Sequence, residues 1–579
     1  MFSILFKLKD FFSEHKKIYI ISFFAMTFSN LFRVFIPYII GQTIDYIVKG
    51  TLTKGLLTQI LIFFIVSLVA SYILEILWSY LLFTGSAKLQ RNIRSDLMNH
   101  FLNMRSVFYE KFRVGDLMAR STQDVRSIAE TAGYGMMVLM DSTLFLVIII
   151  SMMSATISWK LTLFSLLPLI ILAYVFGKVG DVVEKRYTVS QDAFSSLNNE
   201  VLEVVDGIRV IRAYVKEESY INKFREQTEN LLDKNNKVAE ANALFMPLVK
   251  TFTAMSTIIS FGYGVYFVYN GMLTVGDIIA FQLYLQMIVW PMISIGELTN
   301  VLRQGSASMT RVEEVLYAKD DMEVAGELAI DRSEDLLMKD LEFQYPSSST
   351  PNLSEINIEI TKGTMLGIVG KTGAGKTTLL RQFLRQYPLG EGIFRYGAVD
   401  IADLGDQELQ RLIGYVPQDH ILFSRSVREN IAFGKSEATD AEILESIRIA
   451  SFDEDLKHMN DGLETLVGEK GVSVSGGQKQ RISLARALIK NPEILILDDS
   501  LSAVDAKTEQ NIITNIKENR ADKTTVISTH RLSAIKEADE IIVLDEGRII
   551  ARGNHNALIE SQGWYYEQFM RQELKAGDE

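Results

Sequence analysis

The stretch Gly370-Lys371-Thr372-Gly373-Ala374-Gly375-Lys376-Thr377 is a complete GxxxxGK[ST] phosphate-binding loop. The apolar run from Met365 to Val369 predicts a buried strand before it, and the residues from Thr378 to Leu384 predict a helix after it. In this context the glycine amides and the helix N-terminus bind an anion. We expect Lys376 to reach the β- and γ-phosphates of a nucleotide and the Thr377 hydroxyl to bind Mg²⁺.

Length and composition divide the chain into two unlike parts. A chain of 579 residues is too long for one core. Long apolar runs fill the first half, whereas the second alternates short apolar strands with charged helices, as a soluble α/β domain does. The net charge of -12 argues against a nucleic-acid surface. The absence of cysteine excludes a disulfide framework, a thiolate metal site and a cysteine nucleophile.

Six stretches in the first part are long enough to cross the roughly 30 Å hydrocarbon core of a bilayer. They are residues 18–48, 56–84, 134–157, 160–182, 244–270 and 277–302. The long connections after the second and fourth stretches carry most of the Lys and Arg, so both connections and both termini are expected in the cytoplasm. Residues 1–17 predict an amphipathic helix on the membrane surface, with a frayed tail as the alternative.

Several residues of the first part are candidates for function. Ionisable groups at bilayer depth are functional hypotheses by default, and they are Arg33, Glu75, Asp141 and Glu297. An internal Arg33–Glu75 ion pair is an equally good explanation for two of them. The aromatic residues that would either line a substrate cavity or fill a helix interface are Tyr263, Tyr266, Tyr284 and Trp290. Residues 115–120 and 206–214 are expected to be either docking tips or simple turns.

The second part carries more groups that suit a nucleotide. The run Ile494–Leu497 ends in Asp498 and Asp499, as expected of a buried parallel strand with functional groups at its C-terminal end. Asp498 is placed to hold Mg²⁺, usually through water. The stretch Val474-Ser475-Gly476-Gly477-Gln478 opens a second helix whose N-terminus can face a phosphate. Tyr345 is a candidate to stack on adenine, although such an aromatic is more often a core or edge residue.

Over its whole length the chain resembles the half-transporters of the ATP-binding-cassette exporters. The motifs occur in the family's order: an aromatic loop at Tyr345, the phosphate loop at 370–377, Gln418 in Val416-Pro417-Gln418-Asp419, Glu469 in Val467-Gly468-Glu469-Lys470-Gly471, the signature at 474–478, the D-loop Ser502-Ala503-Val504-Asp505, and the switch His530 in Ser528-Thr529-His530-Arg531. In that family the signature of one cassette closes on the ATP held by the other. The resemblance therefore implies a dimer with two ATP sites.

The resemblance also implies cofactors and residue roles. ATP and Mg²⁺ are the expected cofactors. The residues expected to bind ATP are Tyr345, Gly370, Lys371, Thr372, Gly373, Ala374, Gly375, Lys376, Thr377, Thr378, Ser475, Gly476, Gly477 and Gln478. Those expected to bind the metal are Thr377, Gln418 and Asp498, and those expected to act in catalysis are Asp499, His530 and Gln418.

Two residues depart from the family's pattern. Val474 replaces a leucine, which is a conservative change. Asp499 stands where the family has the glutamate that polarises the attacking water. The shorter side chain places its carboxylate about 1.5 Å short, and a misplacement of about 1 Å can slow a reaction around 100-fold. The site is therefore expected to bind ATP well and hydrolyse it poorly, as in one chain of the asymmetric heterodimers; a homodimer that tolerates aspartate is the alternative.

The predicted fold is multi-domain. A six-helix α-helical transmembrane domain with long cytoplasmic stalks spans residues 1–310, a connector spans 311–335, and an α/β P-loop nucleotide-binding domain spans 336–579. The predicted function is that of an exporter subunit that moves amphipathic compounds or drugs outward across a bacterial plasma membrane. Alternatives are a lipid or peptide exporter of the same architecture and a membrane sensor that uses ATP binding without transport. The expected partners are a second half-transporter chain, an amphipathic small molecule and the lipid bilayer, with no nucleic acid.

Overall fold

The computed structural model divides into two compact units. The first comprises Met1–Asn103 and Val114–Ala318, and the second comprises Met104–Arg113 and Lys319–Glu579. The structure describes residues 3–319, 326, 328, 330, 334–468 and 474–577. Glu469 and part of the expected connector lie outside the described residues.

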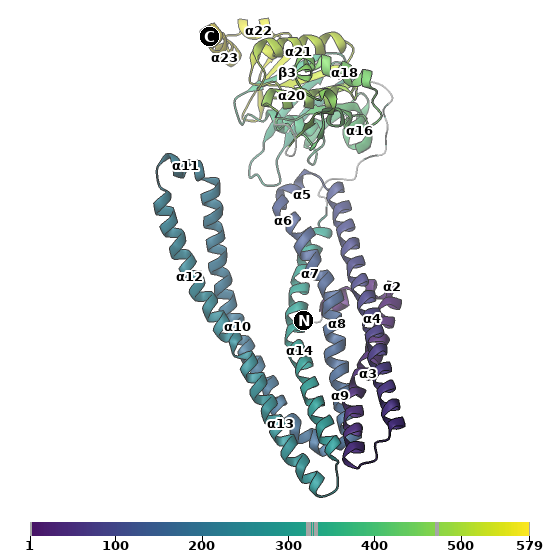
Figure 1. The fold of residues 1–579 in the computed structure, drawn as a ribbon. Helices are drawn as coiled ribbons and strands as arrows, with labels where there is room; N and C mark the ends of the chain where they lie inside the picture. Colours follow the sequence, from purple (N-terminus) through teal and green to yellow (C-terminus); the bar gives the residue numbers. More distant parts are fainter. Residues whose placement is uncertain are drawn as a thin grey trace. The chain divides into compact units, whose positions relative to one another are not determined.

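The first unit is built of helices (Figure 1). They are α1 (Ser3–Lys7), α2 (Lys9–Glu14), α3 (Lys16–Val48), α4 (Lys54–Asn103), α6 (Val114–Ala119), η1 (Arg120–Asp124), α7 (Val125–Glu130), η2 (Thr131–Gly135), α8 (Met136–Met140), η3 (Asp141–Phe145), α9 (Leu146–Met153), η4 (Ser154–Ser158), α10 (Trp159–Asp206), α11 (Ile208–Ala213), α12 (Glu217–Ala243), α13 (Phe245–Tyr269) and α14 (Val275–Leu316). The segments η1 to η4 are π-helical, and α10 and α12 lie side by side with α11 at their tip.

Five helices among the described residues are long and apolar enough to cross a membrane. They are Lys16–Val48, Lys54–Asn103, Val114–Asp206, Glu217–Tyr269 and Val275–Leu316. The expectation of six spans is therefore not confirmed. The third and fourth expected stretches fall within one run of helix, because π-helical segments join α6 to α10 without an intervening loop.

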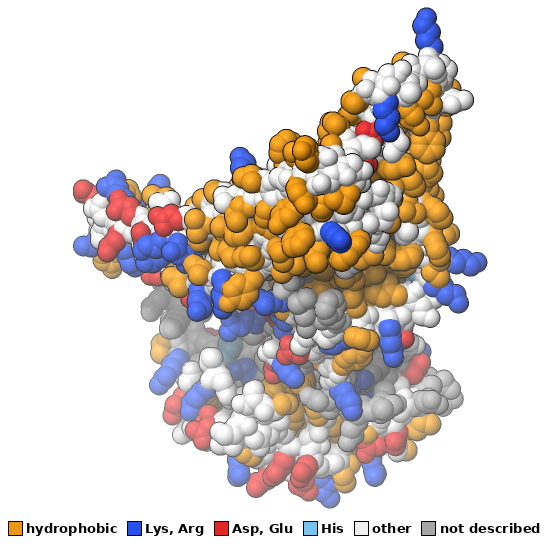
Figure 2. All heavy atoms as spheres, turned by 90° about the horizontal axis from the view of Figure 1, so that it is seen from below, with side chains coloured by type: hydrophobic (Ala, Val, Ile, Leu, Met, Phe, Trp, Pro, Cys, Tyr) orange, Lys and Arg blue, Asp and Glu red, His pale blue; other side chains and the backbone are white. Residues whose placement is uncertain are grey.

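The surface of these helices suits a lipid environment. Large hydrophobic side chains stand exposed along α4, α10 and α13, including Ile62 (56%), Ile170 (62%) and Ile258 (71%). Figure 2 shows hydrophobic side chains covering much of the helical unit on the face in view. So large an apolar surface is rare on a protein surrounded by water. Helices are suited to lipid because they satisfy their backbone hydrogen bonds internally. The first unit is thus a multi-pass membrane domain.

Helices α3 and α14 cross at two glycines. A Cβ atom on Gly276 would lie 2.0 Å from the carbonyl oxygen of Gly41, far inside van der Waals contact. The Asp45 carboxylate accepts a hydrogen bond of 2.9 Å from the Gly276 amide, at the first turn of α14. Small residues let helices of a membrane protein approach this closely. The crossing therefore requires glycine at position 276.

The ionisable side chains of the membrane helices have partners other than those expected. The Arg33 guanidinium lies 5.1 Å from the centre of the Phe145 ring. Among the described residues no ion pair joins Arg33 to Glu75, so the ion-pair interpretation is wrong. Asp141 accepts a 3.0 Å hydrogen bond from the Asn30 amide.

Of the four aromatic candidates, Tyr284 is fully buried, and its hydroxyl donates to the Val34 carbonyl at 2.8 Å. It therefore belongs to a helix interface. Tyr263, Tyr266 and Trp290 are exposed.

The second unit is α/β. Its strands are β1 (Leu336–Phe343), β2 (Leu353–Ile360), β3 (Met365–Gly370), β4 (Glu391–Tyr396), β5 (Val399–Asp400), β6 (Ile413–Val416), β7 (Arg425–Ser426), β8 (Leu466–Val467), β9 (Ile494–Asp498), β10 (Thr524–Ser528), β11 (Glu540–Asp545) and β12 (Arg548–Gly553). Its helices are α5 (Ser106–Lys111), α15 (Lys376–Phe383), η5 (Ile401–Asp403), α16 (Asp406–Leu412), α17 (Val427–Ala432), α18 (Asp440–Ile449), α19 (Asp453–Lys457), η6 (Gly462–Glu464), α20 (Gly476–Leu488), α21 (Ala506–Asn519), η7 (Leu532–Ile535), α22 (His555–Glu560) and α23 (Trp564–Gly577).

A six-stranded sheet in the order β12-β11-β3-β10-β9-β6 forms the centre of the second unit. All neighbours are parallel except the edge pair β11 and β12. Strands β3, β9 and β10 are buried throughout, which confirms the buried strands expected at 365–369 and 494–498. Because parallel strands end at the same edge, the segments after β3, β6, β9 and β10 are brought together there.

A short stretch from between α4 and α6 folds with the second unit. Helix α5 lies within Met104–Arg113, and Val107 packs against the core that contains Tyr387. The Tyr387 hydroxyl donates a hydrogen bond to the Glu110 carboxylate. Residues 115–120, one of the two stretches expected to be docking tips or turns, lie in the first unit, largely in α6. The other, 206–214, also lies in the first unit, around α11.

Candidate nucleotide-binding site

The phosphate loop joins β3 to α15, and its glycines are needed for its shape. Gly373 and Gly375 have φ of 82° and 101°, in the left-handed region that favours glycine. At Gly370 a Cβ would lie 2.2 Å from the Leu544 carbonyl oxygen of the neighbouring strand. The loop can therefore turn its backbone amides inward above the start of α15.

Lys376 lies across this loop. Its ammonium donates to the carbonyls of Gly370 at 2.9 Å and Lys371 at 3.0 Å, which leaves one of its three protons for a ligand. Burial lowers the pKa of Lys376, while the nearby carboxylates of Asp499 and Asp498 oppose that shift. A bound phosphate would add negative charge beside the ammonium and further favour its charged form.

Thr377 and Asp498 meet at the position expected for a metal. The Thr377 hydroxyl donates to the Asp498 Oδ1 atom at 3.3 Å. Asp498 is 2% exposed, and burial raises its pKa, with Asp499 adding to the shift. Its Oδ2 atom is buried and has no hydrogen-bond partner among the described residues. An unpaired carboxylate oxygen beside a hydroxyl fits a hard cation such as Mg²⁺.

Gln418 lies beyond the end of β6, at the same sheet edge. Val416, the last residue of that strand, is opposite Leu497 in the parallel pair, so Gln418 follows one strand as Asp499 follows the next. The described residues contain no cluster of three or more His, Cys, Asp or Glu side chains that would hold a metal unaided. Mg²⁺ typically binds through one or two protein groups, water and substrate phosphates, which this donor set matches.

Tyr345 is fixed beside the beginning of α15. Its hydroxyl donates to the Thr378 Oγ1 atom at 3.1 Å and accepts from Arg381 at 3.2 Å. The rings of Phe343 and Tyr387 meet the half-buried Tyr345 ring edge to face, each at 4.9 Å. The contacts place an aromatic ring next to the loop, as adenine stacking would require.

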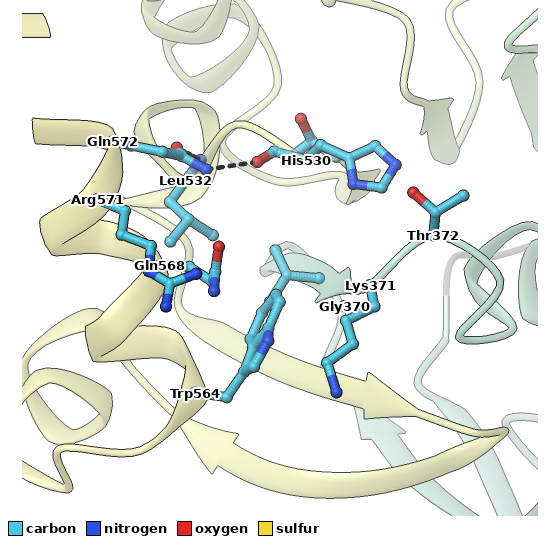
Figure 3. A pocket seen from close by; sticks show the side chains of 11 residues that line it. Gly370, Lys371, Thr372, His530, Leu532, Trp564, Gln568, Arg571 and Gln572 are labelled. Carbon is cyan, nitrogen blue, oxygen red and sulfur yellow. Dashed lines mark hydrogen bonds between the residues drawn. The ribbon is translucent and has the colours of Figure 1, made fainter. Parts of the chain in front are cut away.

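Asp499 and His530 follow the adjacent strands β9 and β10. Asp499 has a left-handed backbone with φ of 47°, and its amide donates to the Ser528 carbonyl at 2.8 Å. Its Oδ1 atom is buried without a hydrogen-bond partner among the described residues. His530, two residues beyond Ser528, is exposed. Figure 3 shows its ring pointing away from the C-terminal helix, toward the side where Thr372 lies.

The signature stretch begins α20 with a reciprocal cap. The Ser475 hydroxyl accepts from the Gln478 amide at 3.3 Å, and the Gln478 side chain accepts from the Ser475 amide at 2.9 Å. Gln478 also donates to Asp455 at 3.0 Å, so its side chain is occupied within the cassette. Ser475 and Gly476 are exposed at the helix start, while Val474 is buried in the core.

Two residues that the sequence did not single out link these motifs. The Gln480 side chain accepts from the Ala503 amide at 3.0 Å, which ties α20 to the D-loop. Arg531 donates to the carbonyls of Ser502 at 2.9 Å and Val504 at 2.7 Å, which ties the D-loop to the switch loop. Arg531 adjoins His530 in sequence, but nothing in the sequence indicates which way its side chain turns.

A cavity of about 390 Å³ lies beside the phosphate loop (Figure 3). It is lined on one side by Gly370, Lys371 and Thr372 and on another by the switch loop at His530. Residues of α23 close the third side. The C-terminal helix is therefore a neighbour of the loop that carries His530.

Comparison with known proteins identifies the family. A family model described as the ABC transporter transmembrane region matches residues 19–292, and one described as ABC transporter matches residues 353–502. The chain is 47% identical to the probable multidrug resistance ABC transporter ATP-binding/permease protein YheI of Bacillus subtilis (strain 168), over 100% of this chain and 99% of that protein. The chain belongs to the ABC transporter family.

A second relative agrees with this, and a solved structure shares the fold. The chain is also 37% identical to the multidrug resistance-like ATP-binding protein MdlA of Escherichia coli (strain K12), over 93% of this chain and 92% of that protein. A solved structure of a bacterial Atm1-family ABC exporter with ATP bound shares its fold, with a TM-score of 0.79 at 23% identity, covering 96% of this chain and 99% of that one. The protein is thus an ATP-driven ABC exporter whose relatives include multidrug transporters.

Proposed function

We propose that this chain is one subunit of a heterodimeric exporter that moves amphipathic compounds outward across a bacterial plasma membrane. Its own ATP site would hydrolyse slowly. The observation that carries the proposal is Asp499, a short carboxylate that directly follows β9 and adjoins Asp498, which accepts a hydrogen bond from Thr377. The exposed Ser475 and Gly476 of the signature support a role in completing the partner's site.

The residues at the sheet edge would have different roles in binding and hydrolysing ATP. The amides of the phosphate loop and Lys376 would bind the ATP phosphates, and Tyr345 would stack on adenine. Thr377, Asp498 and Gln418 would hold Mg²⁺, which neutralises charge on the β- and γ-phosphates. Asp499 and Gln418 would orient the attacking water, and His530 would hydrogen-bond the γ-phosphate. The 1.5 Å by which Asp499 falls short, on the order of a side-chain methylene, is the proposed cause of slow hydrolysis.

The membrane unit would cross the bilayer six times. Ser158 has an extended backbone, with φ of -164° and ψ of 123°, and its side chain caps α10. A helix of 93 residues is far longer than one span needs, because about 20 residues suffice. We therefore place a reversal at Ser158, which gives a span on each side of it.

The transmembrane domain would then occupy about 1–310, the connector 311–335 and the cassette 336–579. The Lys- and Arg-rich long connections would place both termini in the cytoplasm. The tip at α11 would dock on a cassette: Val210 is 62% and Tyr214 73% exposed there.

ATP binding would bring two cassettes together, and hydrolysis would separate them, so that the membrane cavity faces alternate sides. The names of YheI and MdlA favour drug-like amphipathic substrates. A lipid or peptide exporter shares the same architecture, and an ATP-binding sensor remains the rival from another class.

Two experiments test the proposal. Expressed alone, the full-length chain should show little ATPase activity, and co-expression with a glutamate-bearing half-transporter from the same genome should restore it. Robust turnover by this chain alone would contradict the heterodimer and favour an aspartate-tolerant homodimer.

In sealed inside-out vesicles that contain the active complex, an exporter should accumulate an amphipathic dye only with ATP. A sensor would give no accumulation, and transport of labelled lipid but not dye would favour the lipid exporter.

A further inference from the structure

The C-terminal helix α23 is bonded to the loop that carries His530. The Gln572 side-chain amide donates to the His530 carbonyl at 2.8 Å (Figure 3). The oxygen of the same side chain accepts from the Leu532 amide at 3.0 Å. One carboxamide thus satisfies two backbone groups that flank Arg531, much as a neighbouring β-strand would. The contact joins the chain's last helix to the loop between β10 and η7.

Helix α23 is itself firmly held. Tyr565 is 1% exposed within the core, and its hydroxyl lies 2.9 Å from the His555 Nδ1 atom. Phe569 meets the His555 ring edge to face at 4.9 Å, and the Lys536 ammonium lies 5.8 Å from the centre of the Phe569 ring. Gln572 therefore extends from an anchored helix rather than from a loose tail.

The other side of the switch loop is bonded to the sheet and the D-loop. The Thr529 amide donates to the Ile368 carbonyl at 3.1 Å, and Arg531 binds Ser502 as described. The His530 ring has no hydrogen-bond partner among the described residues, so the contacts observed here place the ring only through the backbone that carries it. The Gln572 contact fixes that backbone on the side that faces away from Thr372.

We propose that Gln572 is a positioning residue for His530. By holding the peptide groups on both sides of Arg531, it keeps the His530 imidazole directed at the position of the γ-phosphate. This inference rests on the role proposed above for His530. Loss of the contact would leave the loop free to shift by a fraction of an ångström to about 1 Å, a range in which reaction rates fall by about 10-fold to 100-fold.

The test is a double-mutant cycle in the full-length transporter, in the oligomeric state in which it purifies. The quantity measured is the rate of ATP hydrolysis at this chain's site in a single turnover, which is the slow phase if two different sites are present. Gln572→Ala should slow this rate about 10-fold with little change in ATP affinity. In a His530→Ala background the same substitution should have almost no further effect, because the two residues act through one group.

Two further variants separate positioning from packing. Gln568→Ala removes the same type of side chain one helical turn earlier on α23. Gln568 lines the same cavity but makes no side-chain hydrogen bond among the described residues. This variant should leave the rate unchanged. Gln572→Glu keeps the size of the side chain and still accepts the hydrogen bond from the Leu532 amide. The second carboxylate oxygen cannot donate to the His530 carbonyl, so that hydrogen bond is lost. The glutamate variant should slow hydrolysis like Gln572→Ala, whereas a purely packing role would leave it like the wild type.

The outcomes are distinguishable. If His530→Ala slows hydrolysis but Gln572→Ala behaves like Gln568→Ala, the positioning role is wrong and the proposed function stands. If the effects of Gln572→Ala and His530→Ala multiply in the double variant, Gln572 acts independently and the inference is also wrong. If His530→Ala itself has no effect, the proposed role of His530 and the inference fail together.

Discussion

The backbone amide of Asp499 donates a 2.8 Å hydrogen bond to the carbonyl of Ser528, so the last residue of β10 fixes the residue after β9. Asp499 takes a left-handed conformation there, with φ of 47°, which aspartate tolerates better than most residues. The bond fixes the backbone but leaves one oxygen of the carboxylate unpaired. With the backbone held in place, the length of the side chain limits how far the carboxylate can reach.

The first prediction concerns that length. Asp499→Glu adds the missing methylene and should shorten the lifetime of ATP trapped in this site by about 10-fold to 100-fold, because the carboxylate then reaches the attacking water. The measurement is single-turnover hydrolysis by the full complex. Steady-state turnover should rise only modestly, since a fast partner site would already set the cycle rate.

Asp499→Asn is the matched control, because asparagine keeps the length of the side chain and tolerates the left-handed backbone. It should leave the lifetime long. An unchanged lifetime in the glutamate variant would place the cause elsewhere, most directly in the partner's signature.

The second prediction separates the two ATP sites of the complex. Ser475→Arg puts a bulky cation on the exposed start of α20 and should nearly abolish steady-state ATPase activity, because this signature would serve the partner's fast site. Lys376→Ala removes the ammonium that lies across the phosphate loop, so it should weaken nucleotide retention at this chain's own site, which is proposed to be the slow one, and leave more turnover. Equal loss of activity in the two variants would contradict the asymmetric assignment.

The third prediction separates the ring of Tyr345 from its hydroxyl. Tyr345→Phe removes the hydrogen bonds with Thr378 and Arg381 but keeps the ring. ATP affinity should therefore stay within about 2-fold of the wild type, while the free energy of unfolding falls by about 1 kcal/mol. Tyr345→Ala also removes the stacking surface. Base stacking on an aromatic ring is worth about 1–3 kcal/mol, so its Kd for ATP should rise about 10-fold.

Titration with a fluorescent ATP analogue would measure both Tyr345 variants. If Tyr345→Phe and Tyr345→Ala lost affinity equally, the hydroxyl rather than the ring would be the nucleotide contact.

The fourth prediction concerns the crossing of α3 and α14. Gly276→Ala places a methyl group 2.0 Å from the Gly41 carbonyl oxygen, so it should destabilise the membrane unit by about 1–3 kcal/mol. Gly296→Ala is the control on the same helix, because a Cβ there meets no atom within 4 Å. Thermal unfolding of the detergent-purified transporter should show a lower midpoint for the first variant only. Equal midpoints would mean that the helices separate at this crossing without cost.

Much of the cassette could be predicted because its chemistry is local in sequence. A few consecutive residues are enough to predict each of three features: the strand before Gly370, the helix after Lys376 and the paired carboxylates at Asp498. The parallel sheet then brings these features together. Contacts between distant segments left no such signal. Gln572 is an ordinary glutamine of an amphipathic helix until the fold places it beside His530.

The membrane unit was less predictable for a different reason. Length and hydropathy locate apolar stretches, but they do not show which polar groups face each other. Arg33 and Glu75 have complementary charges, yet Arg33 lies over Phe145. The reversal that would separate the third and fourth spans is a change of backbone at Ser158 without an intervening loop. Counting helices therefore gives five candidates, whereas counting apolar stretches in the sequence gives six.

The ten residues of Met104–Arg113 have a consequence for how such proteins can be recombined. The gene encodes them between two membrane helices, yet Val107 and Glu110 are part of the body that contains Tyr387. A chimaera that exchanges only the sequence after Lys319 would set a foreign surface against Val107 and remove the hydroxyl that Glu110 binds. The unit to exchange in a chimaera therefore consists of two segments that are far apart in the sequence. Substitutions in one segment are expected to covary with substitutions in the other.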